Sequence, residues 1–278
     1  LLLLVFSEEK FRFGHRGLKR INSPFIAQFL LVPALILELK YLVLLGALAF
    51  ASYQDIRTRE IDDKVWLIAG AIGALLTAYE ALTAPSYQAL FALVSIGLTA
   101  LLAFGVYFLG LYGGADAKAL LAIAVTMPLA PTSATLFSPF FPLTVLGNAL
   151  LCSLVLVPAC LVYNVAWSAS RRLPLFTGIR AGALTKIGAL FTGIKVRPRT
   201  ARLVHFNLLE VPAEGEPASK RLRLFAKVTD EDEAKTIDEN AEYVWVTPAI
   251  PMIAFFLAGL VLAALGADLV FWLLALIL

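Results

Sequence analysis

Residues 88–111 read QALFALVSIGLTALLAFGVYFLGL and contain no Asp, Glu, Lys or Arg. A helix needs about 20 mostly apolar residues to cross a bilayer, so this stretch predicts a membrane-spanning helix. The whole chain has 278 residues, of which 60% are apolar and 15% charged, with a mean hydropathy of +0.84. An average soluble domain is about half apolar and about a quarter charged. The composition therefore argues against a soluble enzyme, and it excludes intrinsic disorder and nucleic-acid binding, which need a polar or strongly basic chain.

Other stretches are apolar for long enough, or nearly so, to cross a membrane in the same way. Together they give six predicted spans, at about 34–54, 65–82, 88–111, 117–135, 143–169 and 249–277. Residues 170–247 are more polar and long enough for a small subdomain outside the membrane. We therefore predict an all-α polytopic membrane protein. Residues 34–169 hold the first five transmembrane helices, residues 170–247 form a small cytoplasmic subdomain, and residues 248–278 hold the sixth helix.

The basic residues predict the orientation, because Lys and Arg collect in cytoplasmic loops. Arg57, Arg59 and Lys64 follow the first span, and residues 171–209 contain eight basic residues and no acid. The alternate loops, 83–87 and 136–142, contain no Lys or Arg. The loops at 55–64 and 112–117 and the segment 170–247 are therefore predicted to be cytoplasmic, and the end of the last helix lies outside.

The N-terminal stretch does not fit this arrangement. Residues 1–20 carry six basic residues counting His15, and their apolar opening is too short for a span. An apolar stretch followed by basic residues is also not the order of a secretory signal. We interpret residues 1–33 as an N-terminal extension with a mis-set start, in preference to an additional or re-entrant span at 24–38.

Neither the cysteines nor the histidines predict a metal site. Cys152 and Cys160 lie eight residues apart in one apolar run, which on a helix is about 12 Å of rise and too far for a disulfide. They do not form a CxxC motif, and the two histidines, His15 and His205, are far apart in the sequence. We expect neither a metal nor another cofactor.

Two acidic residues stand at the cytoplasmic ends of predicted spans. Asp55 ends the first span and Asp116 follows the third, so two crossings separate them and both lie on the same side. Ionisable groups at membrane depth are costly and usually mark function. Two adjacent carboxylates share a proton, so one can take a proton from water while the other hydrogen-bonds a scissile carbonyl. The pair therefore predicts an aspartic dyad for peptide hydrolysis; the alternative for either residue alone is an interfacial ion pair with Arg57 or Arg59.

At these residues the sequence resembles the archaeal preflagellin peptidases, which are type IV prepilin-like peptidases of the GxGD aspartic membrane protease family. The resemblance is carried by residues 54–61 (QDIRTREI), 113–118 (GGADAK) and 244–251 (VWVTPAIP). It implies that Asp55 and Asp116 are the catalytic pair on the cytoplasmic face of the cell membrane. It also implies cleavage of a short, positively charged leader from preflagellins or pilin-like precursors. The bacterial relatives also carry paired CxxC motifs and methylate the new N-terminus, so this chain is expected to be a peptidase without methyltransferase activity.

The residues around Asp116 are expected to support it. Gly113 and Gly114 allow close backbone approach and positive φ, and Lys118 can hold charge near the dyad or extend to the headgroups. The third position of the GxGD pattern is Ala115, so the local backbone is expected to differ from that of the family.

A cationic leader predicts acids near the dyad, and Glu60, Asp62 and Asp63 follow Asp55 directly. A second acidic cluster within 230–242 is interpreted as a solvated loop. Aromatic residues near the predicted inner boundaries, Trp66, Tyr243 and Trp245, are interpreted as interfacial anchors.

Two other functions fit part of the pattern. An intramembrane protease of the presenilin and signal-peptide-peptidase kind also uses GxGD, but its Pro-Ala-Leu motif occurs here only at 33–35, before Asp55. An ion-coupled membrane transporter would place its acids at a midplane cavity between broken helices, whereas these acids lie at span boundaries.

Overall fold

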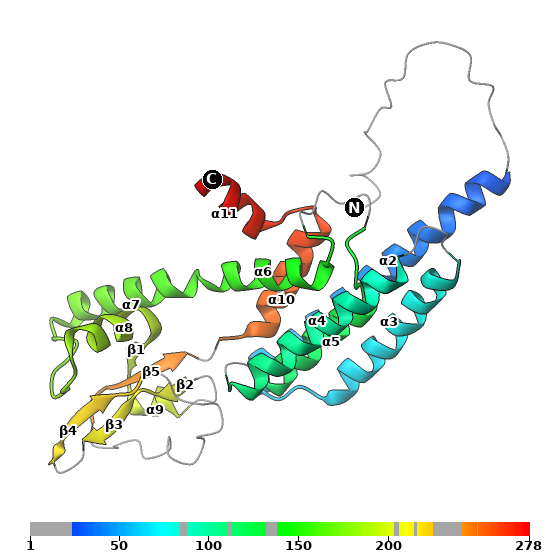
Figure 1. Cartoon of the computed structure of the whole chain (residues 1–278). Coiled ribbons are helices and arrows are strands. Elements are labelled where there is room, and N and C mark those ends of the chain that lie inside the picture. The colour runs from blue at the N-terminus through cyan, green and yellow to red at the C-terminus, as the bar shows by residue number, and fades with distance from the viewer. Residues whose placement is uncertain are drawn as a thin grey trace.

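The computed structural model describes residues 24–83, 88–110, 113–131, 138–202, 206–213, 216–224, 241–248 and 250–278. The expectations for residues 1–23 and for most of the acidic cluster at 230–242 lie outside these ranges. Within them the chain forms a helical bundle joined to a small unit that contains the strands (Figure 1).

The first four helices form the bundle that carries both predicted catalytic residues. They are α2 (Pro24–Thr58), α3 (Asp63–Thr83), α4 (Ala89–Phe108) and α5 (Gly114–Thr126). The core contains Leu44 and Leu48 from α2 and Leu120 and Ile123 from α5, each at most 1% exposed. Residues 24–33 continue α2 without a break, so the boundary predicted at 33/34 does not coincide with the start of a helix.

Apart from Trp66, small residues line the faces on which α3 and α4 pack. The buried residues of α3 are Trp66, Ala69, Gly73 and Thr77, and those of α4 are Ala92, Ser95, Thr99 and Ala103. Small side chains let helix backbones approach closely in a membrane, where burial of apolar surface gives little driving force. The large apolar side chains of the same helices, such as Leu75 and Leu101, face outward and are 72% exposed.

A partly buried ion pair explains why the first span tolerates a lysine. Lys40 on α2 is 3% exposed, and its Nζ lies 2.5 Å from Glu80 Oε2 on α3. Charged groups at membrane depth are usually paired in this way.

Helix α5 ends well before the predicted end of its span at residue 135. It stops at Thr126, and the chain then runs extended to a bridge between Leu129 and Phe140. Pro128 lacks an N–H and favours an extended conformation at Met127, so the helix cannot continue regularly. Hydroxyl groups from other helices hydrogen-bond to the carbonyls at and after the end of α5. Thr77 donates to Thr126 O at 2.8 Å, and Ser95 donates to Pro128 O at 2.7 Å.

The last two predicted spans are each formed by two helices. The first pair is α6 (Phe141–Ser153) and α7 (Leu156–Arg171). The second pair is α10 (Met252–Ala264) and α11 (Leu269–Ile277), and the axes of these two helices differ by 73°. Asn148 of α6, fully buried, holds this bend: its Nδ2 donates to Ala267 O at 2.9 Å and its Oδ1 accepts from Leu269 N at 2.8 Å. Asp268 caps α11 by accepting from Phe271 N.

Length and composition identify four helices in the described residues that can cross a membrane, or five if the bent pair counts as one span. These four are Val32–Thr58, Asp63–Thr83, Ala89–Phe108 and Phe141–Arg171. The prediction of a mainly helical chain with several membrane-spanning helices is confirmed. The predicted number of six is reached only if the short α5 also counts.

The segment between α7 and α10 contains strands that the sequence analysis did not predict. It comprises α8 (Ala183–Thr192), β1 (Ile194–Val196), α9 (Pro198–Ala201), β2 (Phe206–Leu208), β3 (Glu210–Ala213), β4 (Glu216–Leu222) and β5 (Val244–Pro248). Strands β1, β5 and β2 form one antiparallel sheet in that order, and β3 pairs with β4.

Trp245 is not an interfacial anchor, as the sequence analysis expected. It is fully buried in β5 and stacks on Phe176 with ring centroids 5.0 Å apart. Its indole N–H donates to Leu175 O at 3.0 Å. It therefore belongs to the core of the strand-containing unit. Trp66 is also buried, at 6% exposure, and packs in the core of the bundle.

Candidate active site

Asp55 lies in the last turn of α2, three residues before the helix ends at Thr58. The Thr58 hydroxyl donates to Gln54 O at 2.9 Å, and the backbone of Arg59 adopts the left-handed region with φ 60°. In this position Arg59 Nη1 lies 3.3 Å from Asp55 Oδ1 and 3.5 Å from Oδ2. Asp55 is only 8% exposed, so its carboxylate is buried beside one guanidinium.

Asp116 lies in the first turn of α5, before the predicted span and outside the four helices that are long enough to cross a membrane. The N–H of Gly113, the residue that caps the helix, donates to Asp116 Oδ2 at 3.1 Å. The free N–H groups at the N-terminus of a helix favour a negative charge. The local sequence thus fixes this carboxyl group at the start of α5.

The prediction that Gly113 and Gly114 adopt positive φ is wrong. Gly113 has φ −71° and Gly114 begins α5, whereas the nearest glycine with positive φ is Gly110, at 70°. A Cβ at Gly114 would be in ordinary contact with the Tyr107 ring, at 3.6 Å, so α4 and α5 approach closely there. Ala115 lies in regular helix, and its departure from the family pattern therefore requires no unusual backbone.

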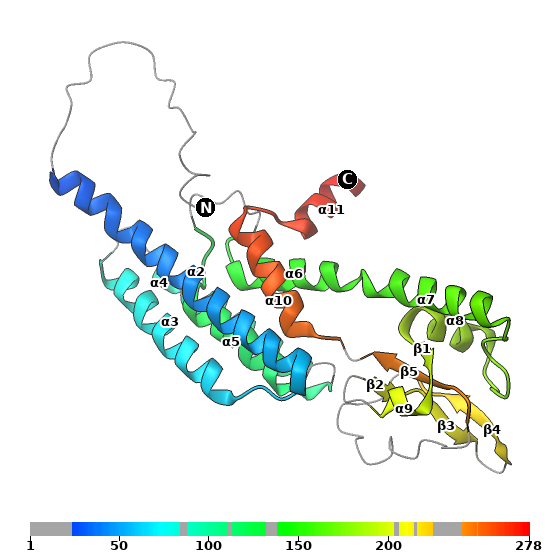
Figure 2. The same cartoon turned by 180° about the vertical axis from the view of Figure 1, so that it is seen from behind.

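The structure brings the two carboxyl groups to the same end of the bundle. The last turn of α2 and the first turn of α5 lie together there (Figure 2), and the charges of Asp55 and Asp116 interact. Burial, and secondly the Asp55 charge, raise the pKa of Asp116 to about 6, although the Gly113 hydrogen bond and the Arg59 charge act in the opposite direction. A carboxyl group of this kind can be protonated near neutral pH while its neighbour is ionised, which is the requirement for general acid–base catalysis by a pair.

The three acids expected to bind substrate have different partners. Asp63 Oδ1 lies 2.6 Å from Lys118 Nζ, so this pair joins the start of α3 to the first turn of α5. Asp62 accepts from Lys64 N at 3.0 Å, and its carboxylate lies 3.6 Å from Lys64 Nζ. Glu60 is exposed between them and Asp55. Glu60 is therefore the acid most available to a cationic peptide.

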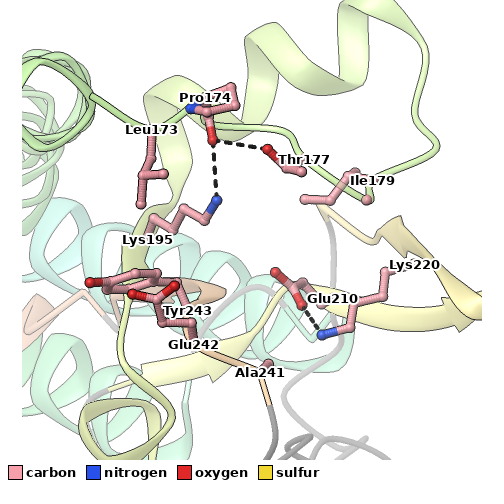
Figure 3. Close-up of a pocket in the computed structure, with 11 residues that line it drawn as sticks. Leu173, Pro174, Thr177, Ile179, Lys195, Glu210, Lys220, Ala241, Glu242 and Tyr243 are labelled. Atoms are coloured by element: carbon pink, nitrogen blue, oxygen red, sulfur yellow. Dashed lines mark hydrogen bonds and ion pairs between the residues drawn. The ribbon is translucent and has the colours of Figure 1, made fainter. Parts of the chain in front are cut away.

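A cavity lined by the segment after α7 and by residues of β1, β3 and β4 contains none of the predicted site residues (Figure 3). Its volume is about 350 Å³, and Lys195 and Glu210 are its most buried charged residues. Both are already engaged: Lys195 Nζ donates to Leu175 O at 3.0 Å, and Glu210 accepts from Trp245 N at 2.8 Å and pairs with Lys220. Burial lowers the pKa of Lys195. We interpret these contacts as ties between the strands and the segment that follows α7.

The described residues contain no group of three or more His, Cys, Asp or Glu side chains placed to hold a metal ion. The sequence analysis named Arg57 and Arg59 as alternative ion-pair partners of the two acids, and the structure shows the pair between Arg59 and Asp55. The position of Arg59 four residues after Asp55 on a helical pattern was a signal for an ion pair, because residues i and i+4 lie on the same helix face.

The region with both acids matches a known family. The model of the type IV leader peptidase family matches residues 42–157, which include Asp55 and Asp116. Three proteins with similar sequences are named preflagellin peptidases. Residues 42–157 of this chain are thus similar to the type IV leader peptidase family. The chain is a peptidase, and the resemblance seen in the sequence is confirmed.

The similarity to the three relatives covers most of each chain. The protein from Methanococcus maripaludis is 28% identical over 228 residues, which are 77% of this chain and 89% of that protein. The one from Methanococcus voltae is 26% identical over 227 residues, 77% of this chain and 88% of that protein. The one from Methanocaldococcus jannaschii is 26% identical over 240 residues, 80% of this chain and 92% of that protein. Together with the apolar helices, the family identifies a multi-pass membrane protein.

Proposed function

We propose that this leader peptidase removes the short, positively charged leader from preflagellins or type IV pilin-like precursors, and that Asp55 and Asp116 perform the hydrolysis. The observation that carries the proposal is the placement of two carboxyl groups at one end of the bundle, where their charges interact: Asp55, buried at the end of α2, and Asp116, half-buried at the start of α5. The names of the three relatives support preflagellin as the substrate class.

The pair can hydrolyse a peptide bond with a single shared proton. The ionised carboxylate takes a proton from water as the water oxygen attacks the carbonyl carbon, and the protonated carboxyl group donates to the carbonyl oxygen. The raised pKa of Asp116, about 6, also suits this role, because it leaves the carboxyl group able to exchange a proton near neutral pH.

The cytoplasmic side is inferred from charge. Arg57 lies in the last turn of α2 and Arg59 and Lys64 follow it, and the segment between α7 and α10 carries the largest group of basic residues. Since basic residues are retained on the cytoplasmic side, the end of the bundle with Asp55 and Asp116 faces the cytoplasm. The leader of a precursor, whose hydrophobic helix lies in the membrane, reaches this end, where Glu60 is exposed.

The test is cleavage of a purified preflagellin by the full chain in lipid vesicles. Asp55→Asn and Asp116→Asn should each abolish cleavage, because the remaining carboxyl group cannot serve as both acid and base. Glu38→Gln is the matched control: it removes an exposed carboxylate from the same helix as Asp55, about 25 Å away along the axis. Retained cleavage in either Asp variant, or equal loss in Glu38→Gln, would disprove the assignment.

The same assay separates the rival functions. An intramembrane protease would cut within the hydrophobic helix of the precursor, and mass spectrometry of the products would place the cut there. An ion-coupled transporter would leave the precursor intact. The family match supports neither rival.

A further inference from the structure

The cations near the dyad are distributed unequally between the two carboxyl groups. Arg59 Nη1 lies within 3.5 Å of both Asp55 oxygens. Arg57 turns away and donates to Tyr53 Oη at 2.5 Å, with its guanidinium 5.8 Å from the centre of that ring. Lys118, two residues after Asp116, lies 2.6 Å from Asp63. The described contacts therefore give a close cation to Asp55, whereas Asp116 receives a neutral backbone N–H from Gly113.

The position of Arg59 depends on an unfavourable backbone. Its φ of 60° is one of two positive values among the described non-glycine residues, and L-residues adopt this left-handed region rarely because the Cβ crowds the following carbonyl oxygen. Its side chain is 18% exposed and that of Asp55 is 12% exposed, so the pair is largely shielded from water. A cation held beside a shielded carboxylate stabilises the ionised form.

We propose that Arg59 is a positioning residue that decides where the proton of the dyad resides: Asp55 starts the reaction as the carboxylate, and Asp116 starts it as the protonated acid. This assignment rests on the proposed function. The net effect on Asp116 agrees with it: burial and the Asp55 charge raise its pKa and favour its neutral form, and they outweigh the Gly113 hydrogen bond and the Arg59 charge, which lower it.

The assignment gives a balanced sequence of proton transfers. Asp55 takes one proton from water while the hydroxide oxygen bonds to the scissile carbon, and the Asp116 proton moves to the carbonyl oxygen. The proton on Asp55 then passes to the amide nitrogen as the carbon–nitrogen bond breaks, and a hydroxyl proton of the intermediate returns to Asp116. The products are one carboxylic acid and one amine, and both aspartates are back in their starting states.

The first experiment compares pH profiles of kcat/KM for the full chain in vesicles with a preflagellin. In Arg59→Gln the profile should move to higher pH, by about one unit, because the Arg59 charge lowers the pKa of Asp116 and its loss favours protonation of the pair. Arg59→Lys should restore most of the profile. Arg57→Gln is the matched control and should leave it unchanged, since Arg57 pairs with Tyr53. Reduced cleavage in Arg59→Gln with an unshifted profile would show that Arg59 is only structural and would overturn the proposal.

The second experiment locates the proton without relying on cleavage. Infrared spectroscopy of the substrate-free chain near pH 5 should show a protonated-carboxyl band that is lost in Asp116→Asn and retained in Asp55→Asn. Loss of the band in Asp55→Asn instead would place the proton on Asp55 and refute the proposal, even if Arg59→Gln fails to fold. The proposed function fails separately, if Asp55→Asn or Asp116→Asn still cleaves the precursor.

Discussion

Gly73 on α3 offers a sharp test of how α5 is positioned. A Cβ at Gly73 would lie 1.9 Å from Thr126 Oγ1, 2.6 Å from Thr126 Cβ and 2.9 Å from Thr126 Cα. Ordinary carbon contacts are about 3.5–4 Å. Rotation of the Thr126 side chain cannot relieve the contact with its Cα, so in Gly73→Ala α3 and the end of α5 must move apart.

The magnitude follows from comparison with Gly70, one turn earlier on the same helix. A Cβ at Gly70 would meet nothing within 4 Å. Both Gly→Ala changes gain about 1 kcal/mol of helix propensity, but only Gly73→Ala overpacks the interface, at a cost of about 1–3 kcal/mol. The free energy of unfolding should therefore be about 1–3 kcal/mol lower in Gly73→Ala than in Gly70→Ala.

The rate of cleavage should differ between Gly73→Ala and Gly70→Ala even more than the stability does. A displacement of about 1 Å at a catalytic group can reduce the rate by about 100-fold, and α5 transmits a shift at Thr126 to Asp116. We expect kcat/KM to fall by about 10- to 100-fold in Gly73→Ala and to be unchanged in Gly70→Ala. The assays are unfolding in mixed detergent micelles and cleavage of a preflagellin in vesicles. Equal stability and equal cleavage in the two variants would refute the close packing of α3 against α5.

Three other predictions use separate features. The unfolding free energy should fall as pH rises through about 6, by on the order of 1 kcal/mol. The reason is that the pKa of Asp116 is raised in the folded chain, so folding opposes ionisation of this carboxyl group. In unfolding titrations, Asp116→Asn should flatten this pH dependence. Asn148→Leu should lower the unfolding free energy by about 2–5 kcal/mol, since it leaves the buried Ala267 carbonyl and Leu269 N–H without their partner. Glu60→Lys should raise KM for Lys- and Arg-rich leaders at low salt and have less effect at high salt, and an equal KM for acidic and basic leaders in both proteins would contradict a role in leader binding.

The spans that the sequence located well are those set by local composition. The predicted spans 65–82 and 88–111 correspond to α3 at Asp63–Thr83 and α4 at Ala89–Phe108. Each is a single apolar run, and a bilayer requires such a run to be helical because its backbone groups have no other partners. The placement of Asp55 and Asp116 at one end also followed from the number of crossings between them.

The features that the sequence analysis missed depend on contacts between distant residues. The early end of α5 relies on hydroxyl groups of Thr77 and Ser95, which lie 49 and 33 residues from their partners in the sequence. Strands β1 and β2 have three residues each, too few for an alternating pattern to be visible. The burial of Trp245 depends on Phe176, which precedes it by a long stretch of chain.

The shortness of α5 has a consequence for the position of Asp116. Its 13 residues rise about 20 Å, less than the roughly 30 Å of a hydrocarbon core, so the bilayer alone cannot fix α5 along the bundle axis. Polar contacts at the two ends of α5 can fix this position. The hydroxyls of Thr77 and Ser95 donate to the carbonyls at and just after its C-terminus, and Lys118 near its N-terminus pairs with Asp63. Three of these four residues belong to α3 and α4, so the distance between Asp116 and the end of α2 is set by packing of protein against protein. The geometry of the proposed dyad is then protected from changes in membrane thickness, but it is sensitive to single substitutions at the far end of α5, about 15 Å along the helix from Asp116.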